Sequence, residues 1–307
     1  MISSGMALKF IRNITAIWLI LLTSATVAAD WREELGTFRI GMLADPGSER
    51  VVAGLAEIRH AFSIALGMPV QIFVARDYAA LIDAQATSRV EYAIYSAMAY
   101  GTARRLCDCV EPLAAKQGEM LDTGIRSVLI LRKQASQSDA DINKARIAVT
   151  QGDGLTGAII PSMALSGADG PPGVGSSQLV IAASDSDAES MFLSGKVDGL
   201  FGWVKSQREA IIQSPSGTIA RLEEAGLPAQ DLDIHWTSEF LPYGPHTVRK
   251  DLSEEAKSLL RQFLTGLAES KPDIHELLAG SGSVALLEVS QGDYRFVYEI
   301  VDRYAGQ

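Results

Sequence analysis

The chain has 307 residues, 47% of them hydrophobic, and a formal net charge of −10. This length exceeds one compact core of typical size and indicates two structural units. The acidic balance argues against nucleic acid or an anionic lipid surface as the partner, because both carry negative charge themselves. It does not exclude a small anionic ligand, since backbone amides at helix starts can outweigh a distant field.

The first 29 residues have the three parts of a secretory signal peptide. Lys9 and Arg12 form a basic start, residues 14–22 are apolar, and small residues follow up to Ala29. The apolar run is too short for a membrane-spanning helix, which needs about 20 apolar residues. We therefore expect export, cleavage after Ala29 and no lipid anchor, since no Cys stands at that site. Cleavage would remove two basic residues and no acid, so the net charge of −10 would become −12.

Strand-like and helix-like segments alternate from residue 38 onward. Residues 38–42 predict a strand, and apolar residues at helical spacing predict a helix over residues 49–66. Strand–helix pairs are also predicted over residues 70–87 and 90–105, where Asp77 can cap the first of the two helices. Strands separated by helices indicate βαβ units and a mainly parallel sheet flanked by helices.

The same pattern then repeats, which predicts a second α/β unit. Its strands are expected at residues 127–132, 146–150, 179–183 and 197–203. The chain becomes extended again from Ile234, and the remainder is predicted to be largely helical, over residues 253–267, 272–278 and 292–304.

The order of these segments predicts two lobes. We expect residues 30–131 and 242–307 to form a discontinuous first lobe and residues 132–241 to form the second. A chain that crosses twice between lobes has a hinge and a cleft between them, where α/β proteins commonly bind ligands.

Gly-rich and hydroxyl-bearing turns follow several of the predicted strands. Residues 152–157 (Gly-Asp-Gly-Leu-Thr-Gly) open a helix, so unpaired N–H groups and the Thr156 hydroxyl could bind an anion there. A plain strand–helix turn with permissive glycines explains the same pattern. Ser96 could cap a helix or donate to a ligand, and Tyr78 could face the cleft or the core. The acids within residues 184–187 favour capping, unless one accepts from a protonated ligand.

Residues for bond chemistry are scarce. Four histidines are scattered, no nucleophile motif occurs, and no carboxylate pair is distinctively placed. Cys107 and Cys109 are two thiols or one local disulfide, and too few ligands surround them for a metal site. We therefore expect neither an enzyme nor a bound metal or cofactor.

Six segments in order resemble the phosphate/phosphite/phosphonate-binding proteins of ABC transporters, and the resemblance covers residues 38–304. The segments are residues 75–84, 91–100, 125–132, 143–161, 185–199 and 238–252. The resemblance implies a two-lobed periplasmic binding protein of type II that is monomeric and acts with an ABC permease. A sensory module that reports to a histidine kinase or chemoreceptor is an alternative.

The resemblance also implies a set of ligand-binding residues. Tyr78, Ser96 and Tyr100 would form the wall of the cleft on the first lobe. The second lobe would hold an oxyanion with residues at two helix starts, namely Gly154, Thr156, Gly157, Ser186 and Asp187.

Two departures from the family pattern bear on the ligand. Gly154 and Leu155 replace two hydroxyl-bearing residues of the family's oxyanion cradle, so only Thr156 keeps its hydroxyl. Asp185 and Ser186 replace a Ser-His pair, and positions aligned with acids that face a ligand ammonium carry Lys205 and Gly244. We expect capture of a small oxyanion such as phosphonate, phosphite or phosphate by hinge closure, with another organic acid or a sulfonate as the alternative.

Overall fold

The computed structural model describes residues 30–43, 54–136, 142–152, 154–167, 170–174 and 178–305. The predicted signal peptide and the first part of the predicted helix over residues 49–66 lie outside these ranges. The described part of the chain contains no helix that is both long and apolar enough to cross a membrane.

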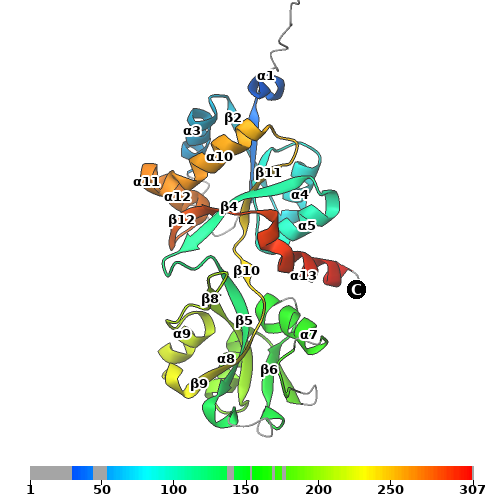
Figure 1. Ribbon diagram of the computed structural model, residues 1–307, viewed down its shortest axis with the longest axis vertical. Coiled ribbons are helices and arrows are strands. Elements are labelled where there is room, and N and C mark those ends of the chain that lie inside the picture. The colour runs from blue at the N-terminus through cyan, green and yellow to red at the C-terminus, as the bar shows by residue number, and fades with distance from the viewer. Residues whose placement is uncertain are drawn as a thin grey trace, which may run out of the picture.

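Two six-stranded sheets lie at opposite ends of an elongated molecule (Figure 1). The first sheet has the order β12-β4-β11-β3-β1-β2. Its strands are β1 (Phe38–Leu43), β2 (Val70–Ala75), β3 (Tyr92–Ile94), β4 (Val110–Gly118), β11 (Pro245–Arg249) and β12 (Ser283–Glu288). Helices pack on its two faces: α1 (Trp31–Leu35), α3 (Leu55–Leu66), α4 (Tyr78–Ala86), α5 (Ala97–Cys107), α10 (Glu254–Thr265), α11 (Leu267–Ser270), α12 (Pro272–Ala279) and α13 (Arg295–Ala305), which η5 (Gln291–Tyr294) precedes.

The second sheet has the order β10-β5-β8-β6-β7, and β9 also pairs with β5. Its strands are β5 (Gly124–Arg132), β6 (Ile147–Thr150), β7 (Leu179–Ala182), β8 (Gly199–Ser206), β9 (Leu232–Thr237) and β10 (Leu241–Pro242). Its helical segments are η1 (Lys133–Ala135), η2 (Leu155–Ile159), α7 (Ile160–Leu165), α8 (Asp185–Leu193), α9 (Gly217–Glu224) and η4 (Ala229–Asp231). Separate buried clusters around Phe192 and Phe201 form the cores on its two faces.

Both sheets are mixed, which corrects the expectation of mainly parallel sheets. Parallel pairing is confined to β1 with β2 and β3, and to β6 with β7 and β8. The antiparallel strands β4 and β12 were not predicted, because Pro112 and the alanines of β4 hide the usual strand pattern. The two-lobed α/β fold itself is confirmed.

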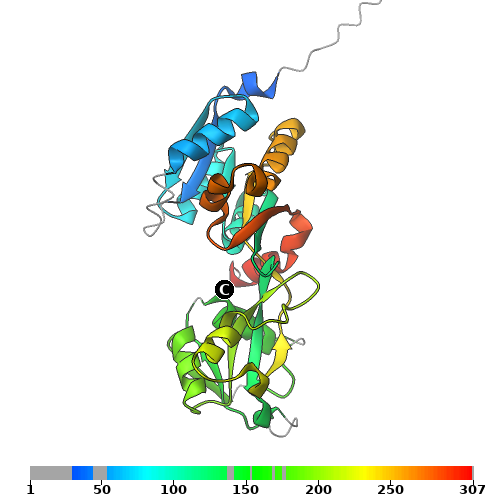
Figure 2. The ribbon, with the colours of Figure 1, turned by 90° about the vertical axis from the view of Figure 1, so that its left-hand side faces the viewer.

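The chain passes between the sheets twice, as predicted (Figure 2). It leaves the first sheet between β4 and β5 and returns between β10 and β11. The two crossing segments are held side by side, since Tyr243 N donates to Thr123 O at 3.1 Å. The pairing of β5 with β8 and β9 places residues 124–131 in the second sheet, whereas the sequence analysis had assigned them to the first lobe.

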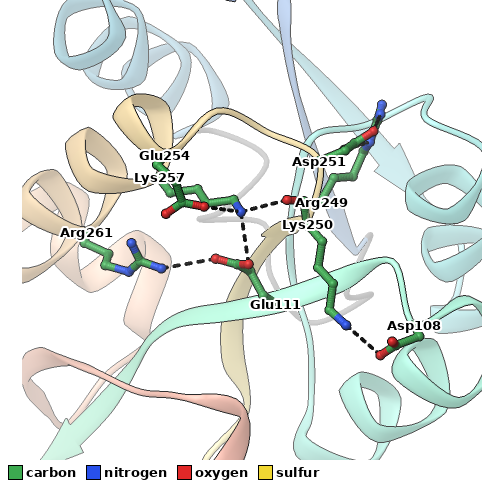
Figure 3. Close-up of polar contacts among 8 residues, drawn as sticks. All are labelled: Asp108, Glu111, Arg249, Lys250, Asp251, Glu254, Lys257 and Arg261. Carbon is green, nitrogen blue, oxygen red and sulfur yellow. Dashed lines mark hydrogen bonds and ion pairs between the residues drawn. The ribbon is translucent and has the colours of Figure 1, made fainter.

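Ion pairs of one buried lysine fasten the returning chain to the first sheet (Figure 3). Lys257 on α10 is 3% exposed, and its Nζ donates to Glu111 Oε2 on β4 at 3.0 Å and to Glu254 Oε1 at 2.8 Å. Glu111 also accepts from Arg261 Nη2 at 3.1 Å. Burial acts to lower the pKa of Lys257, but these carboxylates outweigh it and raise the pKa. The ammonium therefore stays charged inside the structure.

Candidate functional site

Four helical segments begin where parallel strands end. The helices α4 and α5 follow β2 and β3 in the first sheet, while η2 and α8 follow β6 and β7 in the second. Because the strands within each group are parallel, their carboxyl ends meet at one edge of each sheet. Such edges are where α/β proteins place ligands.

Three of these four helix starts are capped by their own side chains. Asp77 accepts from Ala80 N at 2.7 Å, and Ser96 accepts from Ala99 N at 3.1 Å. Ser184 accepts from Asp187 N at 3.2 Å at the start of α8. The capping predicted for Asp77 is confirmed, as is the capping alternative for Ser96.

The start of η2 has no side-chain cap. Gly154 occupies the cap position, and its carbonyl accepts from both Ala158 N at 2.9 Å and Ile159 N at 3.0 Å. The π-helical turn continues directly into α7, so residues 155–165 form one helical run. The N–H groups of its first three residues have no acceptor within the helix, which leaves donors for an anion.

The floor of this turn contains a hydroxyl without a partner. Thr150 at the end of β6 is 7% exposed, and its Oγ1 forms no hydrogen bond with any residue that the structure describes. A Cβ added to Gly157 would lie 2.6 Å from Thr150 Oγ1 and 2.7 Å from Asp185 Oδ1. Glycine is therefore required at position 157 for steric reasons, and two polar oxygens converge beneath the turn.

Thr156 lies within the same turn and is 8% exposed. Its carbonyl accepts from Ser127 Oγ on β5 at 2.7 Å, which fixes the turn to the second sheet. The structure thus brings together the predicted residues Gly154, Thr156 and Gly157. It adds Thr150, which the sequence analysis missed because nothing in a strand's last residue reveals that its hydroxyl has no partner.

Apolar residues from helices of both sheets belong to one cluster. Tyr78 and Met98 from α4 and α5 pack in it together with Leu155, Ile159 and Ile160 from η2 and α7. Tyr78 is partly buried against this cluster, and its ring centroid lies 6.3 Å from that of Tyr95 in the same sheet's part of the molecule. Leu155, at a position where the family carries a hydroxyl, contributes apolar contact instead.

Tyr100 is placed differently from its predicted position on the cleft wall. Its side chain is fully buried, and its ring contacts Tyr294 with 4.8 Å between the centroids. Its hydroxyl accepts from Tyr298 Oη at 2.9 Å. Tyr100 thus packs α5 against α13. The prediction differed because helical spacing indicated a helix but could not show which face of that helix would be covered.

Ser186 and Asp187 belong to the first turn of α8. Asp187 Oδ2 accepts from Ala183 N at 2.9 Å, and Ser186 Oγ lies 3.1 Å from Ser184 Oγ. Both side chains therefore take part in the cap of α8. These hydrogen bonds do not add support for the predicted contact of Ser186 and Asp187 with a ligand.

A polar cluster occupies the crossing between the sheets. Asp122 is 1% exposed and accepts from the Tyr243 hydroxyl, while Lys205 Nζ lies 3.6 Å from its Oδ1. Burial first, and the neighbouring carboxylate second, raise the pKa of Tyr243, so its phenol stays protonated. Tyr294 Oη donates to the Tyr243 carbonyl at 2.7 Å. This cluster links both crossing segments to β8 and to η5.

A cavity of about 240 Å³ lies elsewhere between the two parts of the molecule. Its wall combines Met163 of α7, Trp236 of β9 and Phe296 of α13 with charged groups such as Arg303. Arg303 Nη1 donates to the Met163 carbonyl at 3.3 Å across the junction. The sequence does not reveal this cavity, because its lining comes from three segments that are far apart in the chain.

The described residues include no group of three or more His, Cys, Asp or Glu side chains placed to hold a metal ion. Cys107 and Cys109 are joined by a disulfide at the end of α5, which selects the local-disulfide alternative.

Solved structures similar to this chain share its fold. XAC2383 from Xanthomonas citri bound to chloride is 15% identical, with a TM-score of 0.56 over 88% of this chain and 99% of that one. PhnD1 from Prochlorococcus marinus in complex with methylphosphonate is 14% identical, with a TM-score of 0.50 over 89% and 100%. A binding component of an ABC phosphonate transporter from Pseudomonas aeruginosa is 18% identical over 86% and 85%, with a TM-score of 0.46.

A search of curated proteins finds no match. A family model, by contrast, matches residues 40–294, which is most of the chain. That model describes the ABC transporter, phosphonate, periplasmic substrate-binding protein family. The chain therefore belongs to this family of periplasmic solute-binding proteins.

Proposed function

We propose that this protein captures a small tetrahedral oxyanion of the phosphonate type at the turn formed by residues 154–157. The observation that carries the proposal is the uncapped start of η2, where three N–H groups lack an acceptor within the helix. Membership of the phosphonate-binding family supports a ligand of this class. Helix starts of this kind bind anions through both their N–H groups and the helix dipole.

We propose that the ligand is enclosed between the two sheets by movement about the two crossing segments. The crossings lie at residues 119–123 and 243–244, and apolar residues of both sheets' helices, Tyr78 and Leu155 among them, belong to one cluster. A ligand that touches both edges binds the closed arrangement better than the open one and shifts the population toward it. An ABC permease would read the closed shape, after delivery of the chain to the periplasm by residues 1–29.

Capture rather than turnover is the proposed activity. The turn offers N–H groups, two threonine hydroxyls and one carboxylate, and no histidine contributes to it. A wholly buried histidine does occur at His246 on β11, where burial lowers its pKa to about 3. Its Nδ1 shares a hydrogen bond with the Tyr92 hydroxyl in the first sheet's core, so its role there is packing.

Calorimetric titration of the purified mature chain with methylphosphonate, phosphite, phosphate and methanesulfonate tests the proposal. We expect at least one phosphorus oxyanion to bind, and Thr156→Ala to weaken its affinity by about 10-fold, as the loss of one hydrogen bond to a charged group predicts. Thr237→Ala is the matched control, because the exposed Thr237 lines the cavity beside α13 instead. Weakening by Thr237→Ala alone would move the site to that cavity, and binding of none of the four anions would refute the proposed ligand class.

A further inference from the structure

Asp185 stands at the oxyanion turn as an unpaired acceptor. It is the first residue of α8, and its Oδ1 lies 2.7 Å from the point where a Cβ of Gly157 would be. Thr150 Oγ1 lies 2.6 Å from the same point, so these two oxygens are at most 5.3 Å apart. A carboxylate thus borders the site proposed for an anion.

No neighbour satisfies this carboxylate or the hydroxyl beside it. The Asp185 side chain makes no hydrogen bond or ion pair with the residues that the structure describes, whereas Asp187 two positions later accepts from Ala183 N. Thr150 Oγ1 is both buried and without a partner. Buried polar atoms are nearly always paired, so an unpaired one aimed at this turn points to a group that arrives with a ligand.

The chemistry of a carboxylate restricts what that group can be. An ionised carboxylate only accepts hydrogen bonds. A fully ionised oxyanion also only accepts, so it would face Asp185 with repulsion and no hydrogen bond. An oxyanion that keeps one proton can donate it to Asp185 while its other oxygens accept from the N–H groups of η2.

We infer that Asp185 is a specificity-determining residue that selects oxyanions carrying an acidic proton. This inference rests on the proposed function and narrows its ligand class. Monoanionic phosphonates, phosphite and phosphate satisfy the requirement because each retains a P–OH group. Sulfonates and fully ionised phosphonates do not, since neither has a proton to donate to the carboxylate.

Methylphosphonate and methanesulfonate form the matched probe pair. At mildly acidic pH, where the methylphosphonate monoanion predominates, both ions carry one negative charge and a methyl group, and they differ by the proton. Calorimetry on the wild-type chain should give at least about 10-fold tighter binding of methylphosphonate, because a site built to accept a hydrogen bond rejects analogues that lack the donor. In Asp185→Asn the two affinities should come within about 3-fold of each other, since the amide can donate to either anion.

Glu224→Gln is the control for the loss of one negative charge. Glu224 is exposed at the end of α9, so Glu224→Gln should leave the wild-type preference for methylphosphonate over methanesulfonate unchanged. Thermal unfolding of each variant checks that it folds, and Asn in place of the exposed Asp185 leaves the Ser184 cap of α8 in position.

Two results would overturn the inference, and they differ in what else they affect. If methylphosphonate binds and Asp185→Asn keeps the wild-type preference, Asp185 does not select the ligand, although the proposed function stands. If neither anion binds the wild type or Asp185→Asn, the proposed oxyanion function fails and the inference fails with it.

Discussion

The helices that follow the parallel strands of the two sheets differ in how their polar groups are satisfied. In the first sheet, both strand-end helices are capped by their own residues, Asp77 and Ser96, and the buried Lys257 has two carboxylate partners. In the second sheet, the start of η2 has no side-chain cap and the buried Thr150 hydroxyl has no partner. Three of the four strand-end helix starts are thus completed by their own side chains, Ser184 at α8 being the third, whereas η2 keeps N–H groups without an acceptor in the helix. The difference supports the proposed ligand site at the η2 turn.

The largest expected effect tests the first half of this comparison. Lys257→Met removes the cation that pairs with Glu111 and Glu254, and it should lower the free energy of unfolding by about 3 kcal/mol. Urea denaturation of the mature chain measures this loss.

Lys250→Met is the matched control in the same network (Figure 3). Lys250 Nζ lies 2.6 Å from Asp108 Oδ1, but both side chains are substantially exposed. Loss of this ion pair should therefore lower the free energy of unfolding by less than about 1 kcal/mol. Equal losses in the two variants would show that the first sheet does not depend on its buried pairs.

The next effect tests the shape of the turn. Gly157→Ala places a Cβ against Thr150 and Asp185, and β-branched Thr150 has little freedom to move. We expect about 2 kcal/mol of destabilisation, as for other overpacked sites, and a loss of oxyanion affinity of about 30-fold or more. Denaturation and calorimetry on one preparation measure both quantities.

Gly154→Ala provides the comparison within the same turn. Its added Cβ would meet only Thr150 Oγ1, at 3.3 Å, and its backbone lies outside the left-handed region. It should therefore fold and bind far better than Gly157→Ala. Similar behaviour of the two variants would contradict the packing described beneath the turn.

The smallest expected effect tests the unpaired hydroxyl of Thr150. The change in the free energy of unfolding has the opposite sign to the change expected for Lys257→Met. Thr150→Val keeps the shape of the side chain and removes a buried hydroxyl that has no partner. The free energy of unfolding should rise by about 1 kcal/mol, while oxyanion affinity falls. A loss of stability would mean that the hydroxyl already has a structural partner in the free protein.

Local signals in the sequence predicted much of this fold. Asp77 and Ser96 were recognisable as caps because each precedes a helical pattern directly, and the glycines after β6 marked a strand–helix turn. The side chains of Tyr100 and Thr150 were not predictable in this way. Whether Tyr100 meets α13 or solvent depends on residues almost 200 positions later, and whether Thr150 finds a partner depends on how β6, η2 and α8 pack together.

The central claim is that oxyanions bind at the N–H groups of the η2 turn. Amide chemical-shift mapping of the isotope-labelled mature chain during titration with methylphosphonate tests it most directly. We expect the largest saturable shifts at Leu155, Thr156 and Gly157. Saturable shifts centred on Trp236 and Arg303 instead, with these three amides unmoved, would contradict it.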